Sequence, residues 1–341
     1  MSMYFGLDFG NSSLKAVSVT GVNTNSFVLS GVGLVQNPAG SVDFLDAEVV
    51  KKLAPAVKNL ISQSGIHDKR AVISIPESKV YSKIVSMPTM SDAELSSAVK
   101  WEAEQFVPVP VSEVEIDYQV VKEARDSTQG QSLVYLVAAP KKLLQAMVDF
   151  VISIGIEPIA IESEMVAVSR SMMHGVESKG STLLMHIGAL STVMGIVDSE
   201  SLSFSHYMNT GGVAMTRGVS QLLSLPIAQA EEYKRTYGLD SGQLEGKVRE
   251  SLMIVMESIV GEVRKAIEYH ATSNKGQVNK IVFSGGGAYL PELSSFFGER
   301  FEGIEIMIGD PFAYAKIGRD VQVPQEKSAY AVAAGLALRI F

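Results

Sequence analysis

Apolar and polar residues alternate near the start of the chain, and this pattern predicts a β-hairpin. The alternating segments Tyr4–Phe9 and Leu14–Val19 flank a polar tip, Gly10-Asn11-Ser12-Ser13. Alternation with a period of two is typical of half-buried strands, and a polar tip that contains glycine is typical of the turn between them. We therefore expect two strands that meet at residues 10–13.

A second segment, Thr182–Val197, has the same layout. Shifting the sequence by 178 positions places Asp8 over His186 (186 − 8 = 178) and Gly10 over Gly188. Such repetition indicates an internal duplication, in which each of two lobes begins with its own hairpin. A chance match between two unrelated hairpins is the alternative.

Between the hairpins, Ser91-Asp92-Ala93-Glu94 has the spacing of a capping box and predicts that a helix begins there. Apolar residues follow at helical spacing until Pro108 and Pro110 end the pattern. The flanking strands are expected at residues 71–75, 79–87, 114–121 and 133–138. These elements predict a small α/β subdomain, inserted into the first lobe at about residues 76–158.

The rest of the chain alternates helical and strand patterns, which favours an α/β fold. Helices are expected at residues 228–237, 248–272 and 330–339, and a strand at residues 280–284. The expected divisions are a first lobe at 1–180, a second lobe at 181–328 and a closing helix at 329–341 that returns to the first lobe.

Composition mainly excludes functions. The chain has 341 residues, of which 46% are hydrophobic and 19% charged, enough for more than one core. A net charge of −8 leaves no basic surplus for nucleic acid, and the basic pairs Lys51-Lys52 and Lys141-Lys142 are interpreted as solvated helix faces. Without cysteine there is no disulfide, thiolate metal site or Cys nucleophile. We see no secretory signal and no apolar run near the ~20 residues that cross a bilayer, so we expect a cytoplasmic protein.

The first hairpin carries groups that suit a phosphate chain. They are Asp8, Gly10, Asn11, Ser12, Ser13 and Lys15. Gly10 lets backbone amides turn toward a phosphate, and Lys15 can reach back across the hairpin as a cation. Asp8 is expected to hold Mg²⁺ through water, because this ion dehydrates reluctantly. An ordinary polar turn is the alternative.

Two further stretches offer the same chemistry from the second half of the chain. Gly188, Ser191 and Thr192 form the second hairpin tip, and Asn209-Thr210-Gly211-Gly212 adds a flexible loop rich in amides. A phosphate chain held between two such hairpins is a sensible geometry.

Two other stretches suit the nucleoside end of a nucleotide. Gly285-Gly286-Gly287 follows a predicted strand and precedes a helix expected near Pro291, and its lack of side chains permits close approach of a ring or ribose. Glu231 and Lys234 lie on one helix face and could grip hydroxyls and a base edge. A plain loop and an intrahelical ion pair are the respective alternatives.

Other site types lack support. The chain has neither the Walker P-loop spacing nor a dinucleotide-binding Gly-x-Gly-x-x-Gly. Its five histidines show no metal spacing, and no Ser/His/Asp constellation stands out.

The order and spacing of these stretches resemble the actin-like ATPase superfamily. Within it, Trp101-Glu102-Ala103-Glu104-Gln105-Phe106 with the following Pro-x-Pro, and Asp117-Tyr118, resemble the PilM family of type IV pilus assembly proteins. The segment 160–164, followed by Ala167 and Arg170, is similar to that family's acidic linker. The resemblance implies a two-lobed fold with duplicated ribonuclease-H-like cores, and ATP with Mg²⁺ as ligands.

The resemblance also assigns roles to the residues named above. It places the hairpin residues and Gly211-Gly212 at the phosphates, and Glu231, Lys234 and Gly285 to Gly287 at adenosine. One position departs from the family, because His186 stands where an acidic residue normally helps to order magnesium. Glu162 is then the remaining acidic candidate for activating a water, and we expect ATP binding with slow or absent hydrolysis.

By the same resemblance, the chain is expected to be a cytoplasmic scaffold of the pilus platform, peripheral to the inner membrane. Its expected partners are the N-terminal peptide of a PilN-like membrane protein, other platform and motor proteins of twitching motility, and further copies in a ring. One alternative is an FtsA-like filament, which usually ends in an amphipathic helix that this chain lacks after Phe341. A small-molecule kinase is another, for which we find no general base.

Overall fold

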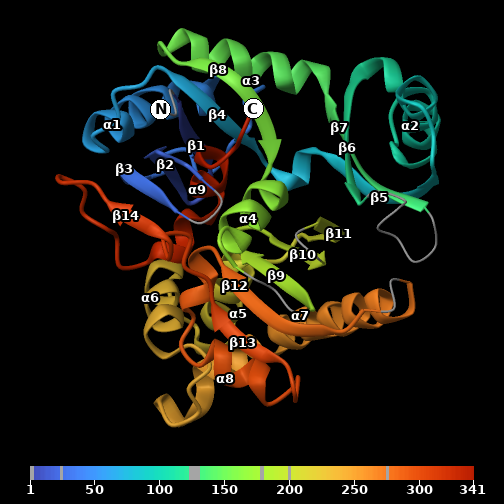
Figure 1. Cartoon of the computed structure of the whole chain (residues 1–341). Coiled ribbons are helices and arrows are strands. Elements are labelled where there is room, and N and C mark those ends of the chain that lie inside the picture. The colour runs from blue at the N-terminus through green and yellow to red at the C-terminus, as the bar shows by residue number, and fades with distance from the viewer. Residues whose placement is uncertain (1–3, 24–25, 123–130, 177–179, 199–200, 274–275) are drawn as a thin grey trace.

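A computed structural model describes residues 4–23, 26–122, 131–176, 180–198, 201–273 and 276–341. The chain forms two lobes, each built around its own sheet, and a smaller subdomain projects from the first lobe (Figure 1). The α/β class predicted from the sequence is confirmed. No helix of the described residues combines the length and apolar character that a membrane span requires.

The first-lobe sheet contains six strands, with the predicted hairpin in its middle. In order across the sheet they are β14 (Ala315–Ile317), β3 (Phe27–Gln36), β2 (Ser13–Thr20), β1 (Phe5–Phe9), β4 (Arg70–Ile75) and β8 (Glu157–Ser163). Antiparallel β1 and β2 place Asp8 opposite Lys15. Helices α1 (Ala47–Gln63) and α3 (Lys141–Ser153) bury their apolar faces against this sheet.

The second-lobe sheet repeats this arrangement. Its order is β11 (Ser201–Met208), β10 (Thr192–Asp198), β9 (Ser181–Ile187), β12 (Val278–Ser284) and β13 (Glu305–Ile308). This order corresponds to β3-β2-β1-β4-β8 of the first lobe. The register agrees as well, because His186 lies opposite Val193 (8 + 178 = 186; 15 + 178 = 193). The predicted duplication is therefore confirmed at the level of single residues.

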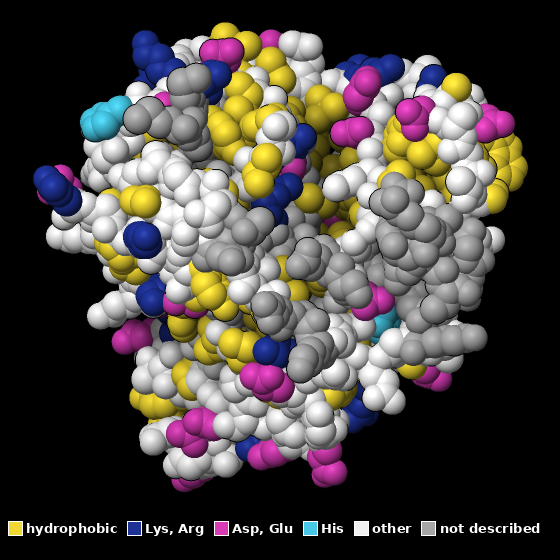
Figure 2. Space-filling model, in the orientation of Figure 1, with side chains coloured by type: hydrophobic (Ala, Val, Ile, Leu, Met, Phe, Trp, Pro, Cys, Tyr) yellow, Lys and Arg dark blue, Asp and Glu magenta, His cyan; other side chains and the backbone are white. Residues whose placement is uncertain are grey.

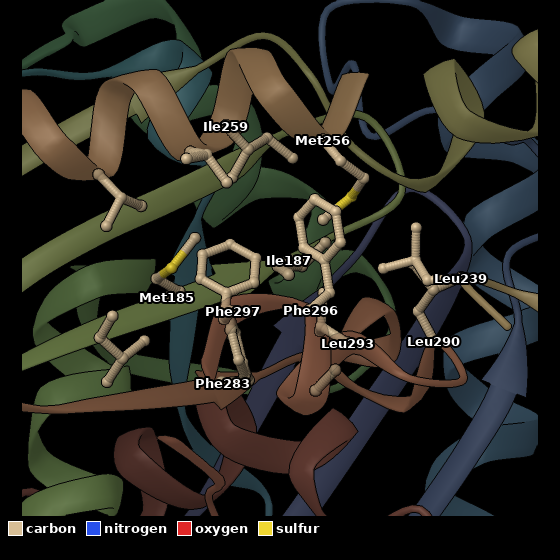
Figure 3. Close-up of a cluster of buried hydrophobic side chains, with 14 of the residues drawn as sticks. Met185, Ile187, Leu239, Met256, Ile259, Phe283, Leu290, Leu293, Phe296 and Phe297 are labelled. Atoms are coloured by element: carbon tan, nitrogen blue, oxygen red, sulfur yellow. The ribbon is translucent and has the colours of Figure 1, made fainter. Parts of the chain in front are cut away.

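Helices pack onto the second sheet to form a large apolar core. They are α5 (Gly212–Leu223), α6 (Ile227–Tyr237), α7 (Lys247–Ser273) and α8 (Leu293–Gly298). Figure 3 shows Met256 and Ile259 of α7 pointing toward Phe296 and Phe297 of α8. The Phe297 ring also meets Phe283 of β12 edge-on, with ring centroids 4.9 Å apart. Truncation of such a buried ring typically costs about 3–5 kcal/mol.

The inserted subdomain consists of β5 (Tyr81–Pro88), β7 (Gln131–Pro140), β6 (Val114–Lys122) and α2 (Asp92–Phe106). The predicted capping box is confirmed, because Ser91 and Glu94 each accept a backbone N–H of the other. The insertion is shorter than the expected 76–158. Helix α3 packs its Leu143 and Met147 into the first-lobe core, and β8 pairs with β4 of the first-lobe sheet.

The return of the chain to the first lobe also differs from the expected boundary at residue 328. Strand β14 pairs in parallel with β3, so the chain already rejoins the first-lobe sheet at Ala315. The closing helix, α9 (Ala331–Ala337), follows the 3₁₀ turn η6 (Lys327–Tyr330) and packs against β1 and α4 (Glu164–Met173). A side chain at Gly335 would overlap the Ala167 carbonyl, which explains why this crossing uses a glycine.

Candidate nucleotide-binding site

The first hairpin holds a largely buried ion pair near its tip. Lys15 Nζ lies 3.1 Å from Asp8 Oδ2 and donates to the Ser13 carbonyl at 3.4 Å, so the lysine reaches back across the hairpin as predicted. Ser74 Oγ donates to Asp8 Oδ1 at 3.1 Å and accepts the Phe9 N–H at 3.0 Å. The Asp8 carboxylate is therefore fixed at the end of β1 by groups from two strands.

The hairpin tip is held by a residue that the sequence patterns did not single out. Asn37 Nδ2 donates to the Gly10 carbonyl at 3.0 Å, and the Asn37 N–H donates to the Ser12 carbonyl at 2.9 Å. A Cβ on Gly10 would lie 2.6 Å from the Ser13 carbonyl oxygen, so the turn requires glycine. Asn11, Ser12 and Ser13 remain partly or fully exposed, which leaves their donors available to a ligand.

The second hairpin tip rests against the start of α5. The Gly212 N–H donates to the Gly188 carbonyl at 3.0 Å, and Thr192 Oγ1 donates to the Thr210 carbonyl at 2.8 Å. The tip itself closes through the Gly188 N–H and the Ser191 carbonyl, 2.8 Å apart. Residues 209–211 form the expected loop between β11 and α5, but Gly212 already begins α5, with Gly211 as its N-cap. The Gly212 N–H is therefore held beside the second hairpin.

Lys234 of α6 joins the same assembly. Its Nζ pairs with Glu231 Oε2 at 2.6 Å and donates to the Gly212 carbonyl at 3.2 Å and to Thr216 Oγ1 at 3.0 Å. The intrahelical ion pair considered as the alternative is thus present. The lysine is 8% exposed, whereas the Glu231 side chain is 44% exposed and open to a ligand.

The glycine triplet packs against the second hairpin and leaves one open surface. Gly285 has φ +84° and its N–H donates to the Ser328 carbonyl at 3.0 Å. A Cβ on Gly287 would overlap the Ile187 side chain, whereas one on Gly286 would meet nothing within 4 Å. The helix expected near Pro291 is α8, which begins at Leu293.

His186 brings the two hairpins into one site. Burial lowers the pKa of its imidazole to about 4, while the Asp8 carboxylate raises it and the Lys15 ammonium lowers it. These influences place His186 in the electric field of the first hairpin, and η6 contacts both β2 and β12. The ring is therefore neutral at pH 7, with Nδ1 3.0 Å from Ser284 Oγ.

Glu162, the expected catalytic carboxylate, is engaged elsewhere. It forms ion pairs with Arg170, at 2.8 Å, and with Arg339, and its side chain is 9% exposed. This pairing ties β8 to α4 and to the end of the chain, so Glu162 is not placed to order a water. Glu164, at the start of α4, accepts the Glu77 N–H at 3.2 Å. Burial first, and then the charges of Asp8 and Glu77, raise its pKa to about 8. The two carboxylates are two residues apart (164 − 162 = 2) on either side of the β8–α4 junction, and no pattern in the sequence distinguishes their roles.

The assembled residues fit an anionic nucleotide better than a protein-held metal. The open backbone at Gly286, the partly exposed tip at residues 11–13 and the ammonium group of Lys15 suit phosphates and a sugar. No cluster of three His, Asp or Glu side chains within the described residues could hold a metal ion. Mg²⁺ therefore fits only with phosphate and water as its main ligands and Asp8 beside them.

A family model described as "Type IV pilus assembly protein PilM" matches residues 6–341. The chain belongs to the PilM family. In a solved PilM–PilN type IV pilus biogenesis complex, one chain is 24% identical to this one, with 98% of each covered and a TM-score of 0.84. The actin-like ATPase fold expected from the sequence is confirmed by this match.

More distant relatives lie in the same superfamily. Cell division protein FtsA of Streptococcus pneumoniae serotype 2 is 22% identical over 90% of this chain and 75% of its own length. MreB 5 of Spiroplasma citri, solved with AMPPNP, is 14% identical with a TM-score of 0.54 and coverage of 97% and 94%. At these low sequence identities, the similarity between these two proteins and the PilM-family chain extends to the fold alone.

Proposed function

We propose that this PilM-family chain is an ATP-binding scaffold of the type IV pilus assembly platform, which holds the cytoplasmic N-terminal peptide of a PilN-like inner-membrane protein. The observation that supports the nucleotide part is the pair of equivalent glycine-bearing hairpins, one in each lobe, with η6 in contact with both β2 and β12. The charges of Asp8 and Lys15 also act on the pKa of His186. The family match and the fold shared with a PilM–PilN complex support the pilus part.

In this proposal each lobe supplies its own groups to ATP. Lys15 and the tip at residues 10–13 would face the phosphates from the first lobe, and the tip at residues 188–192 from the second. Glu231 and Lys234 would bind the ribose and the edge of the base. Gly286 would offer an open backbone surface to the adenine ring. Asp8 would orient the waters of Mg²⁺, which would supply charge neutralisation between the phosphates when bound.

We further propose that hydrolysis is slow or absent. His186 is neutral at physiological pH, so it adds no carboxylate for a second contact to Mg²⁺. Glu164 holds a proton below about pH 8, so it is a poor acceptor for the proton of an attacking water. ATP then stabilises the closed arrangement of the lobes rather than driving a cycle.

The inserted subdomain is the proposed side for the peptide. Figure 2 shows a hollow between the first lobe and this subdomain, with hydrophobic side chains along part of it. Tyr81, Phe106, Tyr118 and Tyr135 all pack into or against apolar clusters, so none of them is proposed as a peptide anchor. Strand β11 of the second lobe packs against β5 and β6, which would let lobe closure reach this subdomain.

The proposed location is the cytoplasmic face of the inner membrane, reached through the PilN-like partner. Other platform and motor proteins, and further copies in a ring, complete the proposed set of partners.

Isothermal titration calorimetry with nucleotide-free protein tests both parts. We expect ATP to bind at micromolar affinity or tighter, which is a binding free energy of about −8 kcal/mol or more negative. An N-terminal PilN peptide is expected to bind the ATP-loaded protein more tightly than the empty one. No heat with ATP, with native circular dichroism, would overturn the nucleotide part. Failure of the peptide alone would leave that part intact and overturn the scaffold.

A further inference from the structure

The inserted subdomain packs against the second lobe, although its chain leaves and rejoins the first. Strands β5 and β6 lie against β11, the edge strand of the second-lobe sheet. Among the described residues, no strand of the first-lobe sheet packs as extensively against β5 or β6. The chain enters the subdomain through the short 3₁₀ turn η1 (Glu77–Lys79), which follows β4. The position of the subdomain therefore depends on the second lobe as well as on its covalent links to the first.

A single apolar cluster joins the three parts of the molecule. It contains Val72 of the first-lobe sheet, Tyr135 of the inserted subdomain, Met165 of α4, and Val193 and Leu202 of the second-lobe sheet, all of them buried. Protein interiors are packed as densely as organic crystals, so a shift of one wall displaces the others. A movement of the second-lobe sheet is therefore transmitted to the subdomain.

Tyr207 of β11 lies where this cluster meets the second hairpin tip. It pairs with Val193 of β10, and its ring packs against the cluster. Its hydroxyl is 3.5 Å from Asn209 Oδ1. Burial raises the pKa of this hydroxyl, whereas hydrogen bonds with Ser78 and with Ser191 lower it. Ser191 belongs to the hairpin tip and Ser78 to η1, so one phenol group touches the candidate phosphate site and the entry to the inserted subdomain.

η1 is held on its other side by α4, through which the chain passes from the first lobe to the second. Glu164 Oε2, at the start of α4, accepts the Glu77 N–H at 3.2 Å. Ser82 Oγ of β5 in turn donates to Glu77 Oε1 at 3.3 Å. The entry to the subdomain is therefore fixed between α4 and Tyr207, and it is not a free hinge.

We propose that Tyr207 is a positioning residue that couples the second hairpin tip to the inserted subdomain through Ser78. A phosphate at the tip orders Ser191, and Tyr207 carries the change to η1, so the subdomain follows the second lobe. The hollow in Figure 2 lies between the first lobe and this subdomain, and its width changes when the subdomain moves. The inference rests on the proposed function and adds the route by which ATP controls peptide binding.

Calorimetric titration of the full chain with the N-terminal PilN peptide, with and without ATP, tests this route. In the wild type, ATP is expected to raise the peptide affinity by about fivefold or more, and the peptide to raise the ATP affinity by the same factor. Tyr207→Phe and Ser78→Ala remove the two partners of one contact, and each is expected to lower that factor to less than about twofold. The double variant is expected to lower it no further, because the same contact is lost.

Tyr269→Phe on α7 is the matched control, since it removes the same atom from the same lobe at a side chain that is 54% exposed. It is expected to keep the wild-type factor, and all variants are expected to keep the wild-type melting temperature. A factor near one in the wild type, or the wild-type factor in both Tyr207→Phe and Ser78→Ala, would overturn the coupling and leave the proposed function standing if each ligand still binds alone. A wild type that binds neither ATP nor the peptide would overturn the proposed function as well.

Discussion

Asp8 and His186 occupy equivalent positions in the two repeats, but only Asp8 faces a cation across its hairpin. Lys15 lies opposite Asp8, whereas Val193 lies opposite His186. One hairpin therefore presents an ion pair with a 3.1 Å separation, and the other presents a neutral ring. The duplication has kept the backbone of the site and changed its charge.

Lys15→Met tests the charged hairpin. ATP affinity is expected to fall by about tenfold to a hundredfold, because a charge-assisted contact to phosphate is lost. Calorimetry measures the change. Lys247→Met is the control, since this lysine pairs at the surface with Glu245 at 2.8 Å and is expected to leave ATP affinity unchanged. Equal affinities for Lys15→Met and the wild type would remove Lys15 from the site.

His186→Asp tests the neutral hairpin. A carboxylate there would provide a second acidic group for Mg²⁺, so ATP binding is expected to become more dependent on Mg²⁺ and hydrolysis to rise above the slow rate of the wild type. A phosphate-release assay with and without Mg²⁺ measures both effects. Wild-type turnover of order one per second or faster would contradict the role given to His186.

Gly286→Ala and Gly287→Ala form a matched pair. The added methyl is expected to destabilise the fold at Gly287, where it overlaps Ile187, and to leave stability unchanged at Gly286, where nothing lies within 4 Å. If the nucleoside lies against Gly286, that variant loses ATP affinity while it keeps the wild-type melting temperature. Retention of full affinity by Gly286→Ala would place the nucleoside elsewhere.

Glu162 and Glu164 are expected to respond differently to the same substitution. Glu162→Gln leaves two arginines without their carboxylate, so the free energy of unfolding is expected to fall by about 3 kcal/mol. Glu164→Gln resembles the protonated carboxyl present below about pH 8, so it is expected to leave residual ATP turnover near the wild-type rate, with a smaller loss of stability. Urea unfolding and phosphate release on each variant distinguish them. A selective loss of turnover in Glu162→Gln would restore it as the catalytic candidate.

Stability is expected to fall as pH rises, because of Glu77. Its carboxyl is buried at the joint between β4 and the inserted subdomain, and burial raises its pKa from 4.5 to about 7. The folded state then holds a proton that the unfolded state releases above pH 4.5. The stabilisation is complete below that pH and is lost as pH rises through about 7, by up to about 3 kcal/mol.

Glu77→Gln is expected to reduce this pH dependence, and Glu164, whose pKa is also raised, is expected to account for part of the remainder. Urea unfolding at pH 5 and pH 8 measures the difference, with the exposed Glu104→Gln as control. Parallel pH profiles for Glu77→Gln and the wild type would show that Glu77 is not responsible.

The sequence alone determined the repeated units of this protein. Alternation located both hairpins, the offset between Asp8 and His186 matched the strand register, and the capping box fixed where α2 begins. These features are local, because strand period, turn and cap depend on residues close together in the chain. Even the pairing of Lys15 with Asp8 follows from one hairpin register.

Only the tertiary structure decided which distant groups meet. In the folded structure β14 pairs within the first-lobe sheet, Glu162 forms ion pairs with Arg170 and Arg339, and the Asn37 amide donates to the hairpin tip. Such contacts join residues far apart in the chain, and they depend on how whole sheets and helices pack. The sequence does not show on which side of a strand end a carboxylate lies. Its partner is therefore known only from the folded structure.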